Sequence, residues 1–258
     1  MALPLSFRIV EAELRIYRRT WRGSVFSSFL NPILYLLAMG VGLGTLVDAN
    51  LPDGLDGLDY VTFLAPGLLV ATAMQTGAGE GSWKVMAGIK WQLTWNARLA
   101  TPIGVPSLAL GHLLWSFIRV LMVSVSFVIV MMIFQVATPL QAIGSLVPAL
   151  LVGMAMAAAT TAFTSRLEEQ AGLPMFFRFV VIPMFLFSGV FFPITQLPGW
   201  LQPVAYVTPV FHGVELARDI ALGVAPAVDP WVSLAYLSAW IIVGGLLIVP
   251  PLRKRLTP

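Results

Sequence analysis

Residues 105–135 read VPSLALGHLLWSFIRVLMVSVSFVIVMMIFQ, a long apolar run that holds one Arg and no acidic residue. About 20 apolar residues in an α-helix are enough to cross the hydrocarbon core of a bilayer. The apolar residues here are continuous, whereas the strands of a membrane β-barrel alternate between apolar and polar residues. The stretch therefore predicts a membrane-spanning helix.

Further apolar blocks of similar character lie on both sides of this run. The composition agrees with them, because 58% of the residues are hydrophobic, 10% are charged and the mean hydropathy is +0.88. A soluble domain carries roughly 25% charged residues, and disordered chains are poor in apolar ones, so both classes are excluded. We expect an all-α integral membrane protein with six transmembrane helices in a single domain, residues 1–258. The other five blocks cover about residues 24–46, 60–79, 140–164, 173–192 and 231–251.

The basic residues predict the orientation of these helices. Fifteen Lys and Arg against twelve Asp and Glu give a net charge of +3. All but a few of the cations fall before the first block, after the second, after the fourth or after the sixth. The loop after the first block is acidic instead. By the positive-inside rule both termini are cytoplasmic, residues 24–252 form the six-helix membrane domain and residues 253–258 form a cytoplasmic tail. The acids of that loop are Asp48, Asp53, Asp56 and Asp59.

Residues 1–23 have the periodicity of an amphipathic helix. Its apolar positions are spaced by three and four residues, and its charged positions repeat the same spacing on another face. A basic face opposite an aromatic face is typical of a helix that lies in the membrane interface, where Arg15, Arg18 and Trp21 would meet lipid. The alternative is that this helix also contacts a cytoplasmic partner. The apolar face is Leu3, Phe7, Val10, Leu14, Tyr17 and Trp21, and the charged face is Arg8, Glu11, Arg15, Arg18 and Arg22.

A cleaved signal peptide is the alternative for this end of the chain. The apolar stretch is too long for a signal sequence, and no small-residue cleavage site follows it. We therefore expect a retained first helix.

A second basic segment, residues 80–102, is rich in Trp and is stopped by Pro102. Lys and Trp side chains alternate in this way both in nucleic-acid-binding segments and at membrane borders. The membrane border is favoured, and no nucleic-acid partner is expected. The residues concerned are Trp83, Lys84, Lys90, Trp91, Trp95 and Arg98.

The outer segment between the fifth and sixth blocks is apolar but broken by prolines. Its pieces of about ten residues are too short to span, so they predict re-entrant or interfacial half-helices. After Pro209, the residues His212, Glu215 and Arg218 fall on one helical face. They predict either an ion-paired, half-buried patch or part of an outer gate. The residues that break or mark this segment are Pro193, Pro198, Trp200, Pro203 and Pro209.

Several catalytic and energy-converting motifs are missing from the sequence. There is no Cys, and the only histidines are His112 and His212, so neither a thiolate site nor a metal site is expected. No Gly-x-x-x-x-Gly-Lys-[Ser/Thr] loop is present, so this chain would not bind ATP by that route. No acid lies inside a predicted span, with Glu80 at a border, which argues against an ion-coupled transporter or channel. That class remains the alternative, and a membrane enzyme has less support.

Two cations and two small-residue pairs lie inside the predicted spans. Arg178 is near enough to the border for its side chain to reach it, whereas Arg119 is deeper and is expected to face protein or water. Gly40-x-x-x-Gly44 and Gly153-x-x-x-Ala157 permit close helix approach and fit, without proving, oligomerisation.

The motifs from the end of the fifth block onward resemble the type-2 ABC-transporter permease family. They are Leu186-Phe-Ser-Gly-Val-Phe-Phe-Pro193, Leu197-Pro-Gly-Trp-Leu201 and Pro209-Val-Phe-His-Gly-Val-Glu-Leu-Ala-Arg218. The similarity extends over the whole chain and is greatest to the branch of drug-resistance and nodulation-type lipo-oligosaccharide exporters. The loop after the first block is short, so no large extracytoplasmic domain is expected. The Glu-Ala-Ala…Gly loop of bacterial importers is absent, which disfavours import.

The resemblance implies a permease that dimerises, with an identical or homologous protomer, in a bacterial plasma membrane. Two separate subunits would bind ATP and Mg²⁺, and this chain would hold no cofactor. In the family a coupling helix after the second span docks on the ATPase, which corresponds to about residues 81–98 here. Re-entrant pieces correspond to about residues 192–223, and a lateral opening lies between the first helix of one protomer and the fifth of the other. The expected activity is outward movement of an amphipathic drug-like, lipid or lipo-oligosaccharide substrate.

Overall fold

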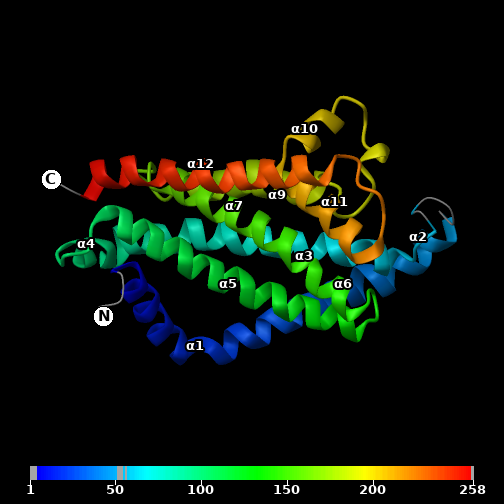
Figure 1. Cartoon of the computed structure of the whole chain (residues 1–258), viewed down its shortest axis with the longest axis horizontal. Helices are drawn as coiled ribbons and strands as arrows, with labels where there is room; N and C mark the ends of the chain where they lie inside the picture. Colours follow the sequence, from blue (N-terminus) through cyan, green and yellow to red (C-terminus); the bar gives the residue numbers. More distant parts are fainter. Residues whose placement is uncertain (1–4, 51–54, 56, 257–258) are drawn as a thin grey trace.

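The computed structural model describes residues 5–50, 55 and 57–256, apart from the side chains at positions 40, 41, 45, 48 and 50. All regular secondary structure in these residues is helical. The helices form an elongated bundle, and the two ends of the chain lie at the same end of it, beside α4 (Figure 1). Leu3, Asp53 and Asp56 of the predicted patterns lie outside the described residues, as do the side chain of Asp48 and the last two residues of the predicted tail.

The helices follow one another with short connections. In chain order they are α1 (Leu5–Tyr35), η1 (Leu36–Leu43), α2 (Gly44–Asn50), α3 (Tyr60–Gly79), η2 (Glu80–Lys84), η3 (Ala87–Trp91), α4 (Thr94–Leu99), α5 (Val105–Ile133), α6 (Pro139–Gly144), α7 (Leu146–Thr164), α8 (Gly172–Phe176), η4 (Phe177–Val181), α9 (Ile182–Phe187), η5 (Ile194–Gln196), α10 (Gln202–Tyr206), α11 (Pro209–Leu222) and α12 (Pro230–Leu256). The segments η1 to η4 are π-helical and η5 is a 3₁₀ turn.

Four helical stretches are long and apolar enough to cross a membrane. They are Tyr60–Trp91, Val105–Ile133, Pro139–Thr164 and Pro230–Leu256, and each corresponds to one of the predicted spans. The fifth predicted block is the shorter apolar helix Gly172–Phe187. At 1.5 Å per residue it extends only about 24 Å, less than the roughly 30 Å of a hydrocarbon core. Six spans and their orientation therefore remain predictions, of which four have a matching helix.

The first predicted block belongs to a helical stretch that runs from Leu5 through α1, η1 and α2 to Asn50. No break separates it from the predicted amphipathic segment, although α1 bends within its first half (Figure 1). The buried face of α1 differs from the predicted apolar stripe. Ile9 and Val10 are buried, whereas Phe7 is exposed.

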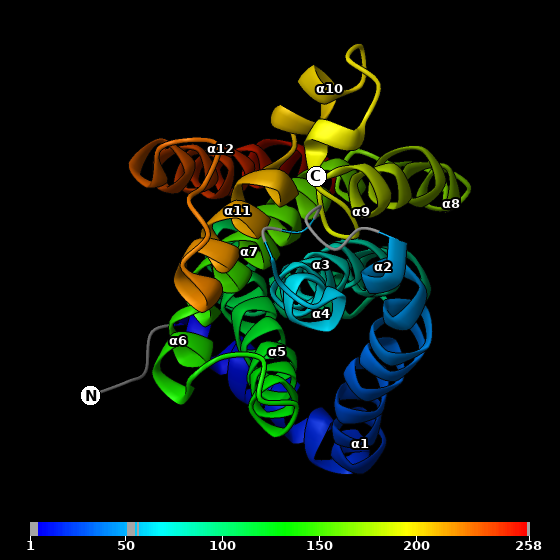
Figure 2. The same ribbon diagram turned by 90° about the vertical axis from the view of Figure 1, so that its right-hand side faces the viewer.

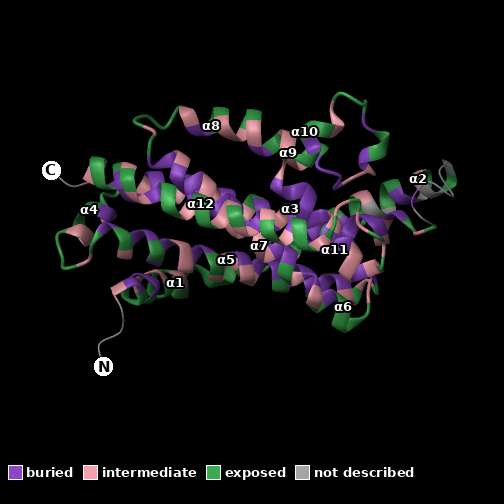
Figure 3. Ribbon diagram, turned by 45° about the horizontal axis from the view of Figure 1, so that its top comes forward, coloured by how far each residue is buried: buried purple, intermediate pink, exposed green. Residues whose placement is uncertain are grey.

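The centre of the bundle is the contact between α3 and α7. Most of α3 is buried, and α5, α7 and α11 surround it (Figure 2, and the buried residues of Figure 3). A Cβ added at Gly77 would lie 2.0 Å from the carbonyl oxygen of Gly153, and one at Gly81 would lie 2.7 Å from that of Ala157. The pair Gly153-x-x-x-Ala157 therefore serves packing inside this chain, where only glycine on α3 allows such an approach.

The last third of the chain first runs outside the centre formed by α3 and α7 and then packs against it again through α11. The helix α8–η4–α9 lies apart from α12 (Figure 3), and the proline-rich segment after it forms only short pieces before α11 packs on α3 and α7. The breaks fall where prolines were expected to cause them, since Pro203 is the second residue of α10 and Pro209 is the first residue of α11. Whether these pieces re-enter the membrane stays a prediction.

Candidate functional site

The segment predicted as a coupling helix is a compact hairpin, η3 followed by α4. The amide of Gln92 bonds to the carbonyl of Ala87 at 2.8 Å, and Leu93 then adopts a positive φ of 52° that turns the chain into α4. Trp95 packs inside the hairpin, and a Cβ at Gly88 would lie 2.5 Å from its ring. The ring of His112 on α5 meets Trp95 edge-on, with ring centroids 5.4 Å apart. The η3–α4 hairpin is thus rigidly seated on the bundle.

The tip of the hairpin is exposed at the end of the bundle where the termini lie (Figure 1). Lys90, Trp91 and Leu93 are exposed, and half of the Trp91 surface is accessible (50%). Exposed aromatic and aliphatic side chains beside a cation are typical of a protein contact. Hence the tip can accept a partner.

The base of the hairpin is fixed by a carboxylate from α1. Glu13 accepts from Arg98 of α4 at 2.7 Å and pairs with Lys84 of η2 at 2.9 Å. Its side chain is only 12% exposed. These contacts tie the N-terminal helix to both ends of the predicted coupling segment.

A second carboxylate extends the contacts to α5. Glu80 lies 3.4 Å from the ammonium of Lys84 and 3.3 Å from Nε of Arg119. We call Glu13, Glu80, Lys84, Arg98 and Arg119 the charged junction. It connects α1, η2, α4 and α5 through two acids and three cations, so the hairpin is joined to α1 and α5 by direct contacts.

Aromatic rings cover two of the three cations of the charged junction. The ammonium of Lys84 lies 4.5 Å from the ring centroid of Trp115, and the guanidinium of Arg119 lies 5.0 Å from that of Tyr17. The two rings also meet edge-on at 5.9 Å. A cation over an aromatic face keeps a favourable electrostatic contact when water is removed. This explains how Arg119 faces protein, as predicted.

The ionisation of Glu13 follows from its surroundings. Burial by itself would raise the pKa of this carboxyl, but the charge of Lys84 and the hydrogen bonds from Arg98 and Lys84 outweigh it. The net result is a lowered pKa. Glu13 is therefore ionised at neutral pH and holds its two cations firmly.

The predicted coupling residues divide into two groups. Lys84 and Arg98 point inward to the charged junction, whereas Lys90 and Trp91 are exposed at the tip. Trp83 is exposed as well, and its ring stacks on Phe177 of η4 with centroids 6.2 Å apart.

Glu13 is the residue that the sequence pattern missed. The charged face of α1 was read from Glu11 and the arginines that follow it, and Glu13 lies off that face. Its partner Arg98 is 85 positions away in sequence. The available signal was the position of Glu13, an acid that lies on the side of the helix opposite the charged face. Of the residues predicted to lie in the membrane interface, Arg15, Arg18 and Trp21 are exposed, and their contact with lipid stays a prediction.

A polar cleft of about 330 Å³ adjoins the charged junction, between α1, α3 and α5. Glu80 and Arg119 line it together with hydroxyl and amide side chains. Such groups can hydrogen-bond a polar molecule at a depth where the surrounding helices are apolar. The other polar side chains are Ser27, Ser28 and Asn31 of α1 and Thr72, Gln75 and Thr76 of α3.

The opposite end of the bundle is organised around Arg218 of α11. This side chain is 4% exposed and lies 3.7 Å from the ring centroid of Phe63. It donates to the carbonyl of Val190 at 3.0 Å and to that of Phe63 at 3.3 Å. Because the hydroxyl of Tyr60 also donates to Phe191 at 3.2 Å, the loop after α9 is held against α3.

The residues of the predicted ion-paired patch, His212, Glu215 and Arg218, share α11, and their side chains reach different segments. An ion-paired patch at this end stays a prediction. His212 contacts Ser233 of α12 and the carbonyl of Tyr206, each at 3.0 Å. Glu215 accepts from the amide of Ala227 at 2.8 Å. The three positions fix three neighbouring segments to α11.

The remaining predicted gate residues lie in the broken segment before α11. Pro193 precedes η5, Pro198 lies between η5 and α10, and Pro209 begins α11 in a buried position. Trp200 is 75% exposed. Ser188 and Thr208 are hydrogen-bonded at 2.7 Å across the base of this excursion. The structure brings these residues to one end of the bundle, and their gating role stays a prediction.

The family profile described as "ABC-2 type transporter" matches residues 6–222. The chain belongs to the ABC-2 type transporter family. This confirms the resemblance drawn from the motifs after the fifth block, and it identifies a membrane-spanning transport permease.

Among curated relatives, proteins named Nodulation protein J are similar over nearly the whole chain. That of Rhizobium meliloti (strain 1021) is 27% identical, over 94% of this chain and 90% of the relative. That of Rhizobium leguminosarum bv. viciae is 27% identical over 94% of each. That of Neorhizobium galegae is 25% identical over 93% of this chain and 90% of the relative. Membership of the family implies partnership with ATP-binding subunits.

Proposed function

We propose that this chain is the membrane-spanning subunit of an ATP-driven exporter in a bacterial plasma membrane. It pairs with a second permease protomer and with two separate subunits that bind ATP and Mg²⁺. The end of the bundle that carries the termini and the η3–α4 hairpin faces the cytoplasm. The observation that carries this proposal is the charged junction, because it connects an exposed docking tip to two helices of the membrane domain.

The tip of the hairpin provides the docking surface. Lys90, Trp91 and Leu93 insert into the ATP-binding subunit, while the packing of Trp95 on Gly88 keeps the hairpin rigid enough to transmit a push. A displacement of the hairpin moves Lys84 and Arg98 and, through Glu13, changes the position of α1. Ion pairs suit this role, because the same charged side chains can exchange partners when the helices shift between two packing arrangements.

The substrate that fits this domain is amphipathic. The polar cleft offers hydroxyl, amide and charged groups to a polar head, and the exposed apolar helices around it suit a lipid-like tail. A drug-like, lipid or lipo-oligosaccharide molecule has this character. The similarity to the Nodulation protein J group supports the same choice.

Co-reconstitution tests the proposal. The chain is purified with its co-expressed ATP-binding subunit in mild detergent and placed in proteoliposomes, where ATP hydrolysis and movement of a fluorescent lipid-linked saccharide are measured. We expect co-purification, and ATP hydrolysis that the saccharide stimulates only when both subunits are present. Flux driven by an ion gradient without ATP would overturn the proposal in favour of an ion-coupled transporter or channel.

A further inference from the structure

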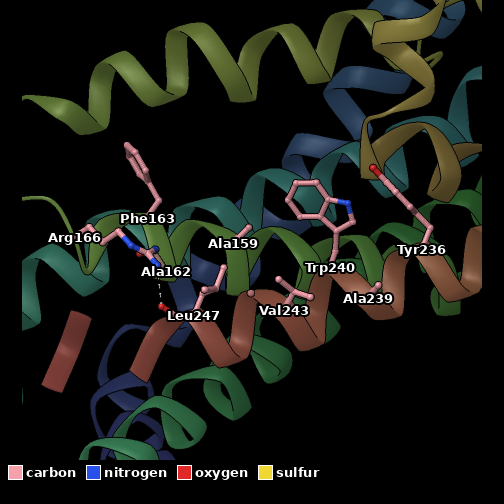
Figure 4. Close-up of a pocket in the computed structure, with 10 residues that line it drawn as sticks. Ala159, Ala162, Phe163, Arg166, Tyr236, Ala239, Trp240, Val243 and Leu247 are labelled. Carbon is pink, nitrogen blue, oxygen red and sulfur yellow. Dashed lines mark hydrogen bonds between the residues drawn. The ribbon is translucent and has the colours of Figure 1, made fainter. Parts of the chain in front are cut away.

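An apolar groove runs between α7 and α12, away from the polar cleft. It encloses about 400 Å³ and is lined by small and aromatic side chains (Figure 4). The lining residues on α12 extend from Tyr236 to Leu247, which at 1.5 Å per residue is about 16 Å. Trp240 points into the groove, and Phe163 lies on the side of the groove that faces α8–η4–α9 (Figure 4). The groove therefore has the length and lining of a site for a hydrocarbon chain.

Arg166 marks one end of this groove. Its guanidinium donates to the carbonyl of Ala162 on α7 at 2.7 Å and to that of Leu247 on α12 at 3.4 Å, which fixes its position. The same residue lines a second pocket of about 350 Å³, together with Lys254 and Arg255 at the end of α12. Glu168 is the acid in that pocket. The apolar groove thus shares Arg166 with a pocket that holds three cations and one acid.

Arg255 provides a second observation that favours an anion here. One of its guanidinium nitrogens, Nη1, is buried and has no hydrogen-bond partner among the described residues. A buried donor without an acceptor is costly, so an anionic oxygen at this position would be favourable.

We propose that the α7–α12 groove and this basic pocket together bind one anionic phospholipid. An acyl chain lies along the groove against Trp240, and the phosphate lies among Arg166, Lys254 and Arg255. The charge and the shape agree, because cations at the end of membrane helices attract anionic headgroups, and the adjoining groove accepts only apolar groups. The bound lipid covers surface between α7 and α12 and keeps the two helices together.

The test uses the purified full chain in detergent and needs no ATP-binding subunit, so its failure is separate from failure of the proposed export. Phosphatidylglycerol with brominated acyl chains is titrated while Trp fluorescence is recorded, since bromine quenches a Trp that it touches. Phosphatidylcholine with the same chains tests the charge, and glycerol 3-phosphate tests a free anion. We expect phosphatidylglycerol to bind about tenfold more tightly than phosphatidylcholine, because the cations of the pocket attract its anionic headgroup.

Two variants locate the lipid. Trp240→Phe should remove the saturable quenching component, and Lys254→Gln with Arg255→Gln should reduce the preference for phosphatidylglycerol to less than twofold. Lys90→Gln is the matched control, since it removes an exposed cation outside the pocket and should leave the preference unchanged. Equal affinity for the two lipids, or unchanged quenching in Trp240→Phe, would overturn the proposal. Loss of the lipid quenching on addition of glycerol 3-phosphate would overturn it too, in favour of a simple anion site.

Discussion

The two ends of the bundle hold their buried polar side chains in different ways. At the end with the termini, the charged junction joins two acidic and three basic side chains from four helices. At the other end, Arg218 reaches backbone carbonyls of α3 and of the loop after α9. Carbonyls cannot change their place without moving the chain, whereas ion pairs can exchange partners. This difference predicts that the first end moves during transport and that the second stays fixed.

Loss of Arg218 is the largest effect that this comparison predicts. Arg218→Met removes two hydrogen bonds from a charged donor, each worth roughly 1.5–3 kcal/mol, so stability should fall by about 3 kcal/mol or more. Thermal unfolding in detergent measures the change. Arg178→Met, at an exposed position of η4, is the control and should stay within about 0.5 kcal/mol. Equal unfolding temperatures for the two variants would show that Arg218 does not fix its end.

The packing of the hairpin gives the next largest effect. In Gly88→Ala the new methyl group meets the Trp95 ring, and overpacking of this kind costs about 1–3 kcal/mol. ATP hydrolysis by the assembled complex should lose its stimulation by substrate, because the hairpin no longer transmits a push. Gly23→Ala, where a Cβ meets no atom within 4 Å, is the control. Stimulation that survives in Gly88→Ala would mean that a rigid hairpin is not needed.

Glu13→Gln tests the charged junction directly. Because solvent partly screens these side chains, we expect the free energy of unfolding to fall by about 1–2 kcal/mol. This value lies between those of exposed and of buried ion pairs. Transport per folded molecule should fall about tenfold, equivalent to ~1.4 kcal/mol in the barrier. Glu11→Gln removes an exposed carboxylate two positions away and should change little. Equal transport by both variants would separate Glu13 from coupling.

The pH dependence of stability gives a smaller effect of known sign. The pKa of Glu13 is lowered in the folded chain, so its contribution is complete above the ordinary carboxyl pKa and is lost as the pH falls through the folded value. The difference in unfolding temperature between wild type and Glu13→Gln should therefore be constant near neutral pH and shrink under acid conditions. A difference that grows on acidification would contradict the ion pairs of Glu13.

Changes at the tip of the hairpin should affect stability least. Trp91→Ala and Lys90→Ala alter exposed positions and should stay within about 0.5 kcal/mol of wild type. Binding of the ATP-binding subunit, measured by co-purification, should nevertheless fall sharply for Trp91→Ala. Trp200→Ala at the other end is a matched exposed Trp and should retain full binding.

The sequence predicted the helices well because apolar length and proline positions are local properties. The block read as residues 60–79 is α3, Tyr60–Gly79, and the block around residues 105–135 contains α5. Motifs after the fifth block were sufficient for the family. The fifth block was read too long, because apolar residues continue after Phe187 although the helix ends there.

The contacts of the charged residues could not be predicted in the same way, because they depend on how distant helices cross. Helical spacing placed His212, Glu215 and Arg218 on one face and suggested that they pair with one another. The neighbouring helices and loops supply carbonyls, a hydroxyl and an amide to them. For the same reason Glu13 was missed, since Lys84 and Arg98 approach it only when α1 lies across α5.

Site-directed cross-linking tests the central claim most directly, namely that the hairpin end receives the push of an ATP-binding subunit. The chain has no native cysteine, so Trp91→Cys and Trp200→Cys each introduce a single reactive thiol. With a co-expressed ATP-binding subunit we expect a cross-link from position 91, with a yield that changes on addition of ATP and Mg²⁺, and none from position 200. A cross-link from position 200, or none from position 91 in a complex that co-purifies, would contradict the account.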